Sequence, residues 1–258
     1  MKVVILAGGL GTRLGEETSI IPKPLVNIGE MPIIWHIMKI YSYYGFNDFI
    51  ICLGYKGNKI KEFFSKLYMY ESDVTFDFTN EFRTTFFEKI KDPWKVTLID
   101  TGLETMTGGR LKRIANLIGE EDFMFTYGDG LSNVDIGELI KSHKESGKIT
   151  TLTAVKPINR FGTISLDGNN VKQFNEKITG EDEWINGGFF VSSYKIFDYI
   201  YGDSCTLEQE PLKNLVRDNQ LNVYKHTGFW QCMDILKEKK YLNDLWNSNN
   251  APWKVWKI

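Results

Sequence analysis

The stretch from Lys2 to Leu14, KVVILAGGLGTRL, decides the fold. It opens with an unbroken apolar run, Val3-Val4-Ile5-Leu6-Ala7, which predicts a short strand buried on both faces. Glycines follow at once, at Gly8, Gly9 and Gly11. A buried strand that runs directly into a glycine-rich turn is typical of the first unit of a parallel α/β sheet.

Short β-branched or aromatic runs alternate with helical patterns through the first 155 residues. We expect strands at Lys2–Ala7, Asp48–Leu53, Val74–Phe78, Val96–Asp100, Phe123–Tyr127 and Thr150–Val155. We expect helices from Pro32 to a stop at Gly45, from Thr107 to Ile118, and from Asp135 to Gly147. This alternation predicts an α/β fold of the Rossmann-like kind, in which helices flank a largely parallel, mixed central sheet.

The pattern becomes hairpin-like after Pro157. Strands are expected at Gly162–Leu166 and Val171–Phe174 around a turn at Asp167–Asn170, followed by a strand at Phe189–Ser192 and several helices. No repeat or linker divides the chain. We therefore expect a single domain over residues 1–258, with a first half (1–155) and a smaller hairpin and helical part (156–258).

Composition excludes several classes of protein. The chain has 258 residues, of which 42% are hydrophobic, and 31 basic side chains nearly balance 33 acidic ones. A balance of this kind gives no field to hold a polyanion, so nucleic acid is not an expected partner. No apolar stretch reaches the roughly 20 residues that span a bilayer, and five apolar residues are too few for a signal peptide. The three cysteines (Cys52, Cys205 and Cys232) form no C-x-x-C pair, which fits a reducing cytoplasm.

The residues from Phe63 to Phe87 are unusually aromatic for a connection between elements. Aromatic clusters usually pack in a core, but exposed ones mark interfaces between subunits. This segment and the tryptophan-rich tail, with Trp246, Trp253 and Trp256, make a homo-oligomer the expected state.

The glycine-rich turn has the chemistry of a phosphate-binding loop. Without Cβ atoms, its backbone N–H groups can approach an anion closely. It is not the dinucleotide fingerprint, which would need glycine at Leu14, and no Walker A sequence occurs. Arg13 follows the glycines, and Lys23 lies between Pro22 and Pro24, whose fixed φ angles lower the entropic cost of presenting the ammonium. Two such cations could neutralise a triphosphate.

Asp129 stands in Tyr127-Gly128-Asp129-Gly130, at the carboxyl end of a strongly apolar strand. In open α/β sheets the ligand crevice lies at this end of the strands. A carboxylate aimed at a polyphosphate would repel it unless a cation lay between them. Mg²⁺ resolves this conflict, because it takes one or two carboxylates and fills its other positions with water and phosphate oxygens. The alternative is an ordinary Asp-Gly turn.

Taken together, these motifs resemble those of the sugar-1-phosphate nucleotidyltransferases. The resemblance begins with Leu6–Arg13 and Pro22-Lys23-Pro24-Leu25, and covers essentially the whole chain. The continuation resembles one branch of that family, the glucose-1-phosphate cytidylyltransferases. The matching stretches are Gly15–Thr18, Pro32–Lys39, Met106–Arg113, Thr126–Gly130, Ile185–Phe190, Leu207–Leu212 and Gly228–Asp234.

The resemblance implies a fold of the nucleotide-diphospho-sugar transferase type, together with a set of site residues. The nucleotide is expected at Leu6, Ala7, Gly8, Gly9, Leu10, Gly11, Thr12, Arg13, Lys23, Thr107, Gly109 and Gly128. The sugar phosphate is expected at Glu176, Lys177, Asn186, Gly187 and Gly188, although on chemistry alone the Asn-Gly-Gly stretch suits a tight turn equally well. Relatives often have proline after the Glu-Lys pair, whereas Ile178 follows here.

The same resemblance assigns the metal and the catalytic groups. It implies that Asp129 and Asp234 bind Mg²⁺, and that Arg13 and Lys23 complete the catalytic set. Asp234 could also cap the helix that follows it. We expect His36 to be a structural hydrogen-bonding group, and no nucleophile elbow is present.

The expected reaction joins CTP to glucose 1-phosphate and gives CDP-glucose and pyrophosphate, by in-line attack on the α-phosphorus. The resemblance also implies a bacterial O-antigen (surface-polysaccharide) deoxysugar pathway. Two alternatives stay open: the same chemistry with UTP, dTTP or another sugar 1-phosphate, and a non-catalytic nucleotide-sensing subunit. One hydrogen bond to the base can decide which nucleotide binds. A single sequence does not show whether the protein group at that position is a donor or an acceptor.

Overall fold

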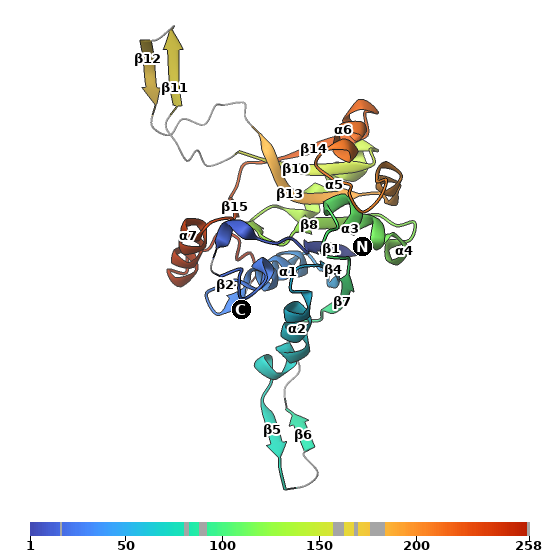
Figure 1. The fold of residues 1–258 in the computed structure, drawn as a ribbon, viewed down its shortest axis with the longest axis vertical. Helices are drawn as coiled ribbons and strands as arrows, with labels where there is room; N and C mark the ends of the chain where they lie inside the picture. Colours follow the sequence, from blue (N-terminus) through green and yellow to red (C-terminus); the bar gives the residue numbers. More distant parts are fainter. Residues whose placement is uncertain are drawn as a thin grey trace.

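The computed structural model describes residues 1–15, 17–79, 83–87, 92–156, 163–167, 170–175 and 184–256. A seven-stranded sheet forms the centre of the molecule, with helices packed against it (Figure 1). Across the sheet the strands are β14 (Leu221–His226), β10 (Thr150–Val155), β13 (Ile185–Ser192), β8 (Phe123–Tyr127), β1 (Val3–Ala7), β4 (Asp48–Leu53) and β7 (Lys95–Asp100). Only β13 runs antiparallel to its neighbours in this sheet. The expected mixed, largely parallel sheet is therefore confirmed.

Strands from both halves of the sequence build this one sheet. β13 and β14 come from the second half; β13 lies between β10 and β8 of the first half, and β14 pairs with the other edge of β10. The sheet is continuous across the boundary that the sequence suggested near residue 155.

Four smaller two-stranded sheets surround the main one. They pair β2 (Asn27–Ile28) with β3 (Met31–Pro32), β5 (Val74–Asp77) with β6 (Arg83–Phe86), β9 (Gly130–Ser132) with β15 (Trp230–Cys232), and β11 (Thr163–Asp167) with β12 (Asn170–Asn175). The strand expected at Val74–Phe78 exists as β5, but the expectation that it belongs to the largely parallel central sheet is wrong. As β5 it joins only β6, in a hairpin that projects from the body beyond α2 (Figure 1).

The helices are α1 (Ile33–Tyr43), α2 (Gly57–Glu71), α3 (Thr107–Arg113), α4 (Ala115–Ile118), α5 (Ile136–Ser146), α6 (Glu210–Arg217) and α7 (Leu236–Asn247). Three short 3-10 turns accompany them: η1 (Thr12–Leu14), η2 (Lys23–Leu25) and η3 (Tyr194–Tyr199). The single helix expected from Thr107 to Ile118 is wrong, because the backbone leaves helical geometry at Ile114 (φ −104°, ψ 7°) and divides it into α3 and α4.

Local signals fix the ends of two predicted helices. Asp135 caps α5 by accepting a hydrogen bond from the backbone N–H of Glu138, at 3.0 Å. Gly45 follows the end of α1 and has a φ of +85°, and Gly147 follows the end of α5 and has a φ of +62°. These positive angles favour glycine because it has no Cβ. These helices therefore stop where the sequence indicated.

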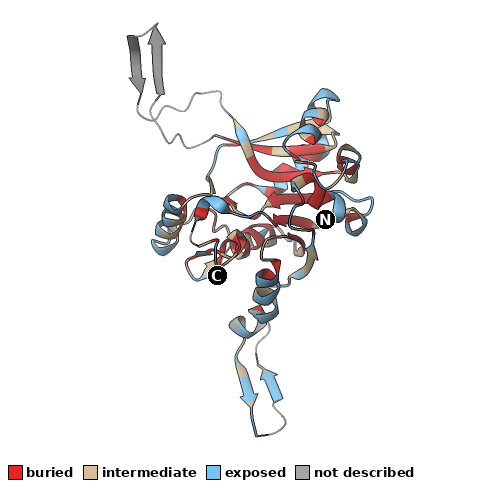
Figure 2. Ribbon diagram, viewed as in Figure 1, coloured by how far each residue is buried: buried red, intermediate tan, exposed pale blue. Residues whose placement is uncertain are grey.

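The core lies on both faces of the sheet (Figure 2). Side chains alternate along β1, so Val3, Ile5 and Ala7 pack in one apolar cluster with α1, while Val4 and Leu6 pack in a second cluster with α3. This two-sided burial explains the unbroken apolar run of β1, because neither of its faces meets water.

The tryptophan-rich tail belongs to the core of its own chain. Trp253 is fully buried and Trp256 is 8% exposed, and both pack with Trp246 around the buried His36 of α1. The rings of Trp253 and Trp256 are therefore used inside the chain, and self-association through this tail stays a prediction. Of the helices that the structure describes, none is both long and apolar enough to cross a membrane.

Candidate active site

A cavity of about 520 Å³ opens at the carboxyl ends of β1 and β8. Most of the residues singled out from the sequence line it: Leu6, Ala7, Gly8, Gly9, Gly11, Thr12, Arg13, Lys23, Thr107, Gly128, Asp129, Asn186, Gly187, Gly188 and Asp234. Parallel strands place the loops that follow them at a common edge, and this brings segments distant in sequence to one crevice.

The glycine-rich turn forms one wall of the cavity. Gly11 has a φ of +64°, and the hydroxyl of Thr18 donates to its carbonyl at 3.0 Å. The left-handed backbone angle suits glycine, because a Cβ would be strained there. The left-handed turn and this hydrogen bond together define the shape of the loop.

Gly8 is required for a different reason, which is the close approach of Arg110. A Cβ at Gly8 would lie 2.1 Å from Nη1 of Arg110. The guanidinium donates to the carbonyl of Gly8 at 3.1 Å and to that of Leu53 at 3.0 Å, and also to Thr101, Gly102 and Leu103. Arg110 is buried, with 4% of its surface exposed. Its hydrogen bonds tie the glycine loop to the ends of β4 and β7.

A four-residue ionic cluster forms the floor of the site. The ammonium of Lys23 lies 2.5 Å from Oδ2 of Asp129 and 2.5 Å from Oδ1 of Asp234. Arg13 donates to the other oxygen of Asp234, at 2.8 Å. The side chain of Lys23 is only 13% exposed, whereas that of Arg13 is 74% exposed. Two formal positive charges thus balance two negative ones.

Strand pairing brings the two aspartates together. Asp129 follows β8 and precedes β9, and Asp234 lies between β15 and α7. β9 pairs with β15, and the N–H of Met233 donates to the carbonyl of Asp129 at 2.9 Å. Their juxtaposition is therefore fixed by backbone hydrogen bonds as well as by Lys23.

Burial and charge act in opposite directions on Lys23. Burial by itself lowers the pKa of the ammonium, but the charges of Asp129 and Asp234 and their hydrogen bonds outweigh it. The pKa of Lys23 is raised overall, so this side chain remains a cation at neutral pH.

The two carboxylates fit a divalent metal ion. Their oxygens already converge on one cation, the ammonium of Lys23. Within the described part of the chain, no group of three or more His, Cys, Asp or Glu side chains is placed to hold a metal. A site with two carboxylates suits Mg²⁺, which usually takes one or two carboxylates and completes its shell with water and phosphate oxygens.

Polar groups from β8, β13 and β15 also line the cavity. Asn186 donates through Nδ2 to the hydroxyl of Tyr127 at 3.2 Å, and its Oδ1 accepts from the N–H of Gly188 at 2.9 Å. Gly188 has a φ of +79°, and its Cβ would lie 2.6 Å from the Tyr127 ring. The indole N–H of Trp230 donates to the carbonyl of Gly187 at 2.7 Å. Glu176 and Lys177 lie outside the described residues.

Two of the expected nucleotide residues are not among those lining the cavity. Leu10 is 52% exposed at the surface. Gly109 packs α3 against the segment before α6, where a Cβ would lie 2.5 Å from the carbonyl oxygen of Asp203.

The cap suggested for Asp234 is wrong. Residue Ile235 holds the N-cap position of α7, and the carboxylate of Glu238 accepts from the backbone N–H groups of Asp234 and Ile235. The structural role expected for His36 is confirmed, since Nε2 bonds the carbonyl of Ile28 at 2.9 Å.

The cavity also contains residues that the sequence did not indicate, including Thr105, Arg110, Tyr127 and Trp230. In the sequence, Arg110 lies in the matching stretch Met106–Arg113, close to two other basic residues, Lys112 and Arg113. Its burial could not be predicted, because no local pattern distinguishes a buried arginine from a solvated one.

A Rossmann-like α/β sheet with a glycine loop and a crevice at its carboxyl edge indicates a class of protein, and comparison with known families identifies that class. The model of the nucleotidyl transferase family matches residues 2–235. The chain therefore belongs to the nucleotidyl transferase family.

Its sequence relatives narrow the assignment to one group in that family. The glucose-1-phosphate cytidylyltransferases of Salmonella typhi and Salmonella typhimurium are each 52% identical over 257 residues, which is 99% of this chain and 100% of each relative. Among solved structures, a UDP-glucose pyrophosphorylase in complex with UDP-glucose has a TM-score of 0.68 at 15% identity, over 96% of this chain and 98% of that one. That structural likeness shows the fold, and the sequence relatives place the chain with the glucose-1-phosphate cytidylyltransferases.

Proposed function

We propose that this protein is a glucose-1-phosphate cytidylyltransferase, which converts CTP and α-D-glucose 1-phosphate into CDP-glucose and pyrophosphate. One observation supports this most directly. Lys23, Asp129 and Asp234 converge beside the glycine loop of a single cavity, in a chain 52% identical to enzymes of that name. The arrangement supplies two cations and two carboxylates where a triphosphate and a metal would meet.

We assign the nucleotide to the side of the cavity built by residues 1–155. The backbone of the loop from Gly8 to Thr12 would bind the phosphates, with Arg13 and Lys23 as countercharges. The base would lie near Thr107 at the start of α3. Leu6, Ala7 and Gly128 line the same region, at the ends of β1 and β8.

We assign the sugar phosphate to the side built by residues 156–258. Asn186, Gly187 and Gly188 of β13 line the cavity there and offer amide and backbone groups for hydroxyls. Glu176 and Lys177 complete the proposed set, with the glutamate toward sugar hydroxyls and the lysine toward the phosphate. The two halves thus bind different reactants, although they share one sheet.

Mg²⁺ is the proposed cofactor, held by Asp129 and Asp234. When bound, it would neutralise phosphate charge and make the α-phosphorus more electrophilic. Lys23 and Arg13, which now contact the aspartates, are close enough to the glycine loop to act on the phosphates instead.

The chemistry needs no covalent intermediate. A phosphate oxygen of glucose 1-phosphate attacks the α-phosphorus of CTP in line, the α,β-bridging bond breaks, and pyrophosphate leaves. A phosphate monoester dianion is already nucleophilic, so positioning and neutralisation of charge suffice without a general base. We assign the positioning of the phosphates and the neutralisation of their charge to Arg13, Lys23 and Lys177.

A substrate panel tests this function. The purified protein is supplied with Mg²⁺, with CTP, UTP or dTTP, and with glucose 1-phosphate or another hexose 1-phosphate, and the release of pyrophosphate is measured. We expect the fastest release with CTP and glucose 1-phosphate. Faster release with UTP or dTTP would reassign the nucleotide, and no release with any pair would favour a nucleotide-sensing subunit.

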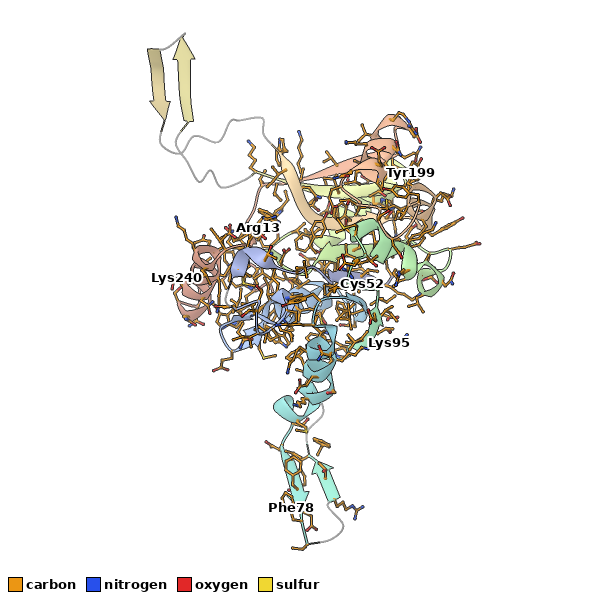
Figure 3. The ribbon with its side chains drawn as sticks, viewed as in Figure 1. Arg13, Cys52, Phe78, Lys95, Tyr199 and Lys240 are labelled. Carbon is orange, nitrogen blue, oxygen red and sulfur yellow. The ribbon has the colours of Figure 1, made fainter. Side chains whose placement is uncertain are left out.

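We also propose that the protein is a cytoplasmic homo-oligomer. The β5–β6 hairpin projects from the body, and Phe78 near its end is 77% exposed (Figure 3). A two-stranded hairpin by itself is marginally stable in water, and exposed aromatic rings favour contact with a second subunit. The thiols of Cys52, Cys205 and Cys232 fit a reducing compartment.

A further inference from the structure

Glu208, in the sequence motif Leu207–Leu212, lies next to the cavity and bonds residues that line it. Glu208 does not line the cavity, but its carboxylate contacts two residues that do. The hydroxyl of Thr107 donates to Oε2 at 2.7 Å, and the hydroxyl of Tyr127 donates to Oε1. Glu208 therefore connects the start of α3 to the end of β8.

The direction of each hydrogen bond in this network follows from the chemistry of its members. An ionised carboxylate only accepts, so the protons of both hydroxyls point at Glu208. The oxygen of Thr107 accepts from the N–H of Leu207 at 2.9 Å, and that of Tyr127 accepts from Nδ2 of Asn186 at 3.2 Å. Both hydroxyls are therefore held in one orientation.

The same reasoning fixes the side-chain amide of Asn186. Its Oδ1 accepts from the N–H of Gly188 at 2.9 Å. The reversed amide would place Nδ2 against that N–H and Oδ1 against a Tyr127 oxygen whose proton is already committed to Glu208. Both contacts would then be mismatched, so only one orientation of Asn186 satisfies the network.

The network leaves a defined donor on the cavity wall. An amide nitrogen has two hydrogens, and Asn186 uses one on Tyr127. Among the residues that the structure describes, this nitrogen has no other acceptor, so its second hydrogen is available to a ligand that supplies an acceptor oxygen, such as a hexose hydroxyl. We propose that Glu208 is a positioning residue for the sugar 1-phosphate, which acts through Tyr127 to orient Asn186. This inference rests on the proposed function.

Burial and local packing are consistent with this role. Tyr127 is partly buried at the end of β8. The ring of Tyr127 packs against Gly188, which leaves it little freedom to find another partner. Glu208 itself is exposed, so replacing it opens no cavity in the core.

The test compares Glu208→Gln with Glu210→Gln, a matched control two positions along on the exposed first turn of α6. Glutamine replaces one of the two accepting oxygens with an NH2 donor, so the two hydroxyls can no longer each keep the oxygen they now bond. We expect Glu208→Gln to raise the KM for glucose 1-phosphate about tenfold and the KM for CTP by a smaller factor, because Thr107 keeps the N–H of Leu207 as a second partner, with Tm unchanged. Glu210→Gln should match the wild type.

A double variant shows whether the effect passes through Tyr127. If it does, Glu208→Gln combined with Tyr127→Phe should raise the sugar KM no further than Tyr127→Phe alone. Unchanged sugar KM in Glu208→Gln, equal rises in both KM values, or additive effects in the double variant would each overturn the proposal. A wild type inactive with CTP and glucose 1-phosphate would instead refute the proposed function, and it is measured first.

Discussion

The ammonium nitrogen of Lys23 lies 2.5 Å from Oδ1 of Asp234, although 211 positions separate the two residues in the chain. The same nitrogen lies 2.5 Å from Asp129. The lysine thus occupies the position between the carboxylates that we assign to a divalent cation, and it must move toward another anion before a metal can bind there.

Metal and nucleotide should therefore bind cooperatively. The triphosphate offers Lys23 a new partner and gives the metal additional oxygen ligands. We expect the affinity for Mn²⁺, followed by electron paramagnetic resonance, to rise at least about tenfold when CTP is present. Lys23→Met should bind Mn²⁺ alone more tightly than the wild type does. Equal Mn²⁺ affinity with and without CTP would contradict this exchange of partners.

Removing the lysine should also slow catalysis. Lys23→Ala, like Asp129→Ala, is expected to lower turnover at least about tenfold, which corresponds to about 1.4 kcal/mol of transition-state stabilisation. Pyrophosphate release by the purified, folded variants measures the effect. Lys240→Ala is the control, since that lysine is 75% exposed on α7 and pairs only at the surface with Asp244. Near-normal turnover in Lys23→Ala would refute the assigned role.

Arg110 should matter for stability and for nucleotide binding together. Lysine keeps the charge at this position but lacks the planar fork that reaches the carbonyls of Gly8 and Leu53. We expect Arg110→Lys to cost about 2–3 kcal/mol and to lower Tm by about 5–10 °C in thermal melts. The KM for CTP should rise, because the glycine loop loses its anchor. A variant with unchanged Tm and CTP KM would show that the loop holds its shape without the fork.

The buried His36 predicts a pH dependence of stability. Burial lowers the pKa of this imidazole from 6.5 to about 4, so the folded protein holds it neutral. The unfolded chain binds the proton first as pH falls, and the folded state therefore loses up to about 3 kcal/mol between pH 6.5 and pH 4.

Urea unfolding at several pH values measures this loss. His36→Gln has no titrating group there, so its free energy of unfolding should fall less over the same interval, whatever its value at pH 7. The comparison uses slopes because the substitution also disturbs the contact with Trp253. Parallel pH profiles for both proteins would show that other groups dominate acid sensitivity.

The projecting hairpin should govern self-association. Phe78→Ser removes an exposed ring from it and is expected to shift the protein toward smaller species in sedimentation velocity. Tyr201→Ser is the control, since Tyr201 is 69% exposed and lies outside the hairpin. An unchanged distribution of species in Phe78→Ser would place the subunit contact elsewhere.

The main sheet was predictable where local pattern and burial agree. Phe123–Tyr127 and Thr150–Val155 are strands with the bounds that their apolar runs indicated. β14 was missed because it forms an edge of the sheet and has a mixed burial pattern, so its sequence lacks a long apolar run. The break between α3 and α4 was missed because the apolar stripe continues through Ile114.

The sequence by itself determined the chemistry of the site. The glycine loop, the proline-flanked Lys23 and the aspartate after a buried strand are local signals, because backbone freedom and strand burial depend on neighbouring residues. Only the tertiary structure decided which groups meet. The pairing of β9 with β15 brings Asp129 close to Asp234. The buried Arg110 donates a hydrogen bond to the carbonyl of Gly8. Such contacts depend on side chains more than 100 positions apart, and no local pattern encodes them.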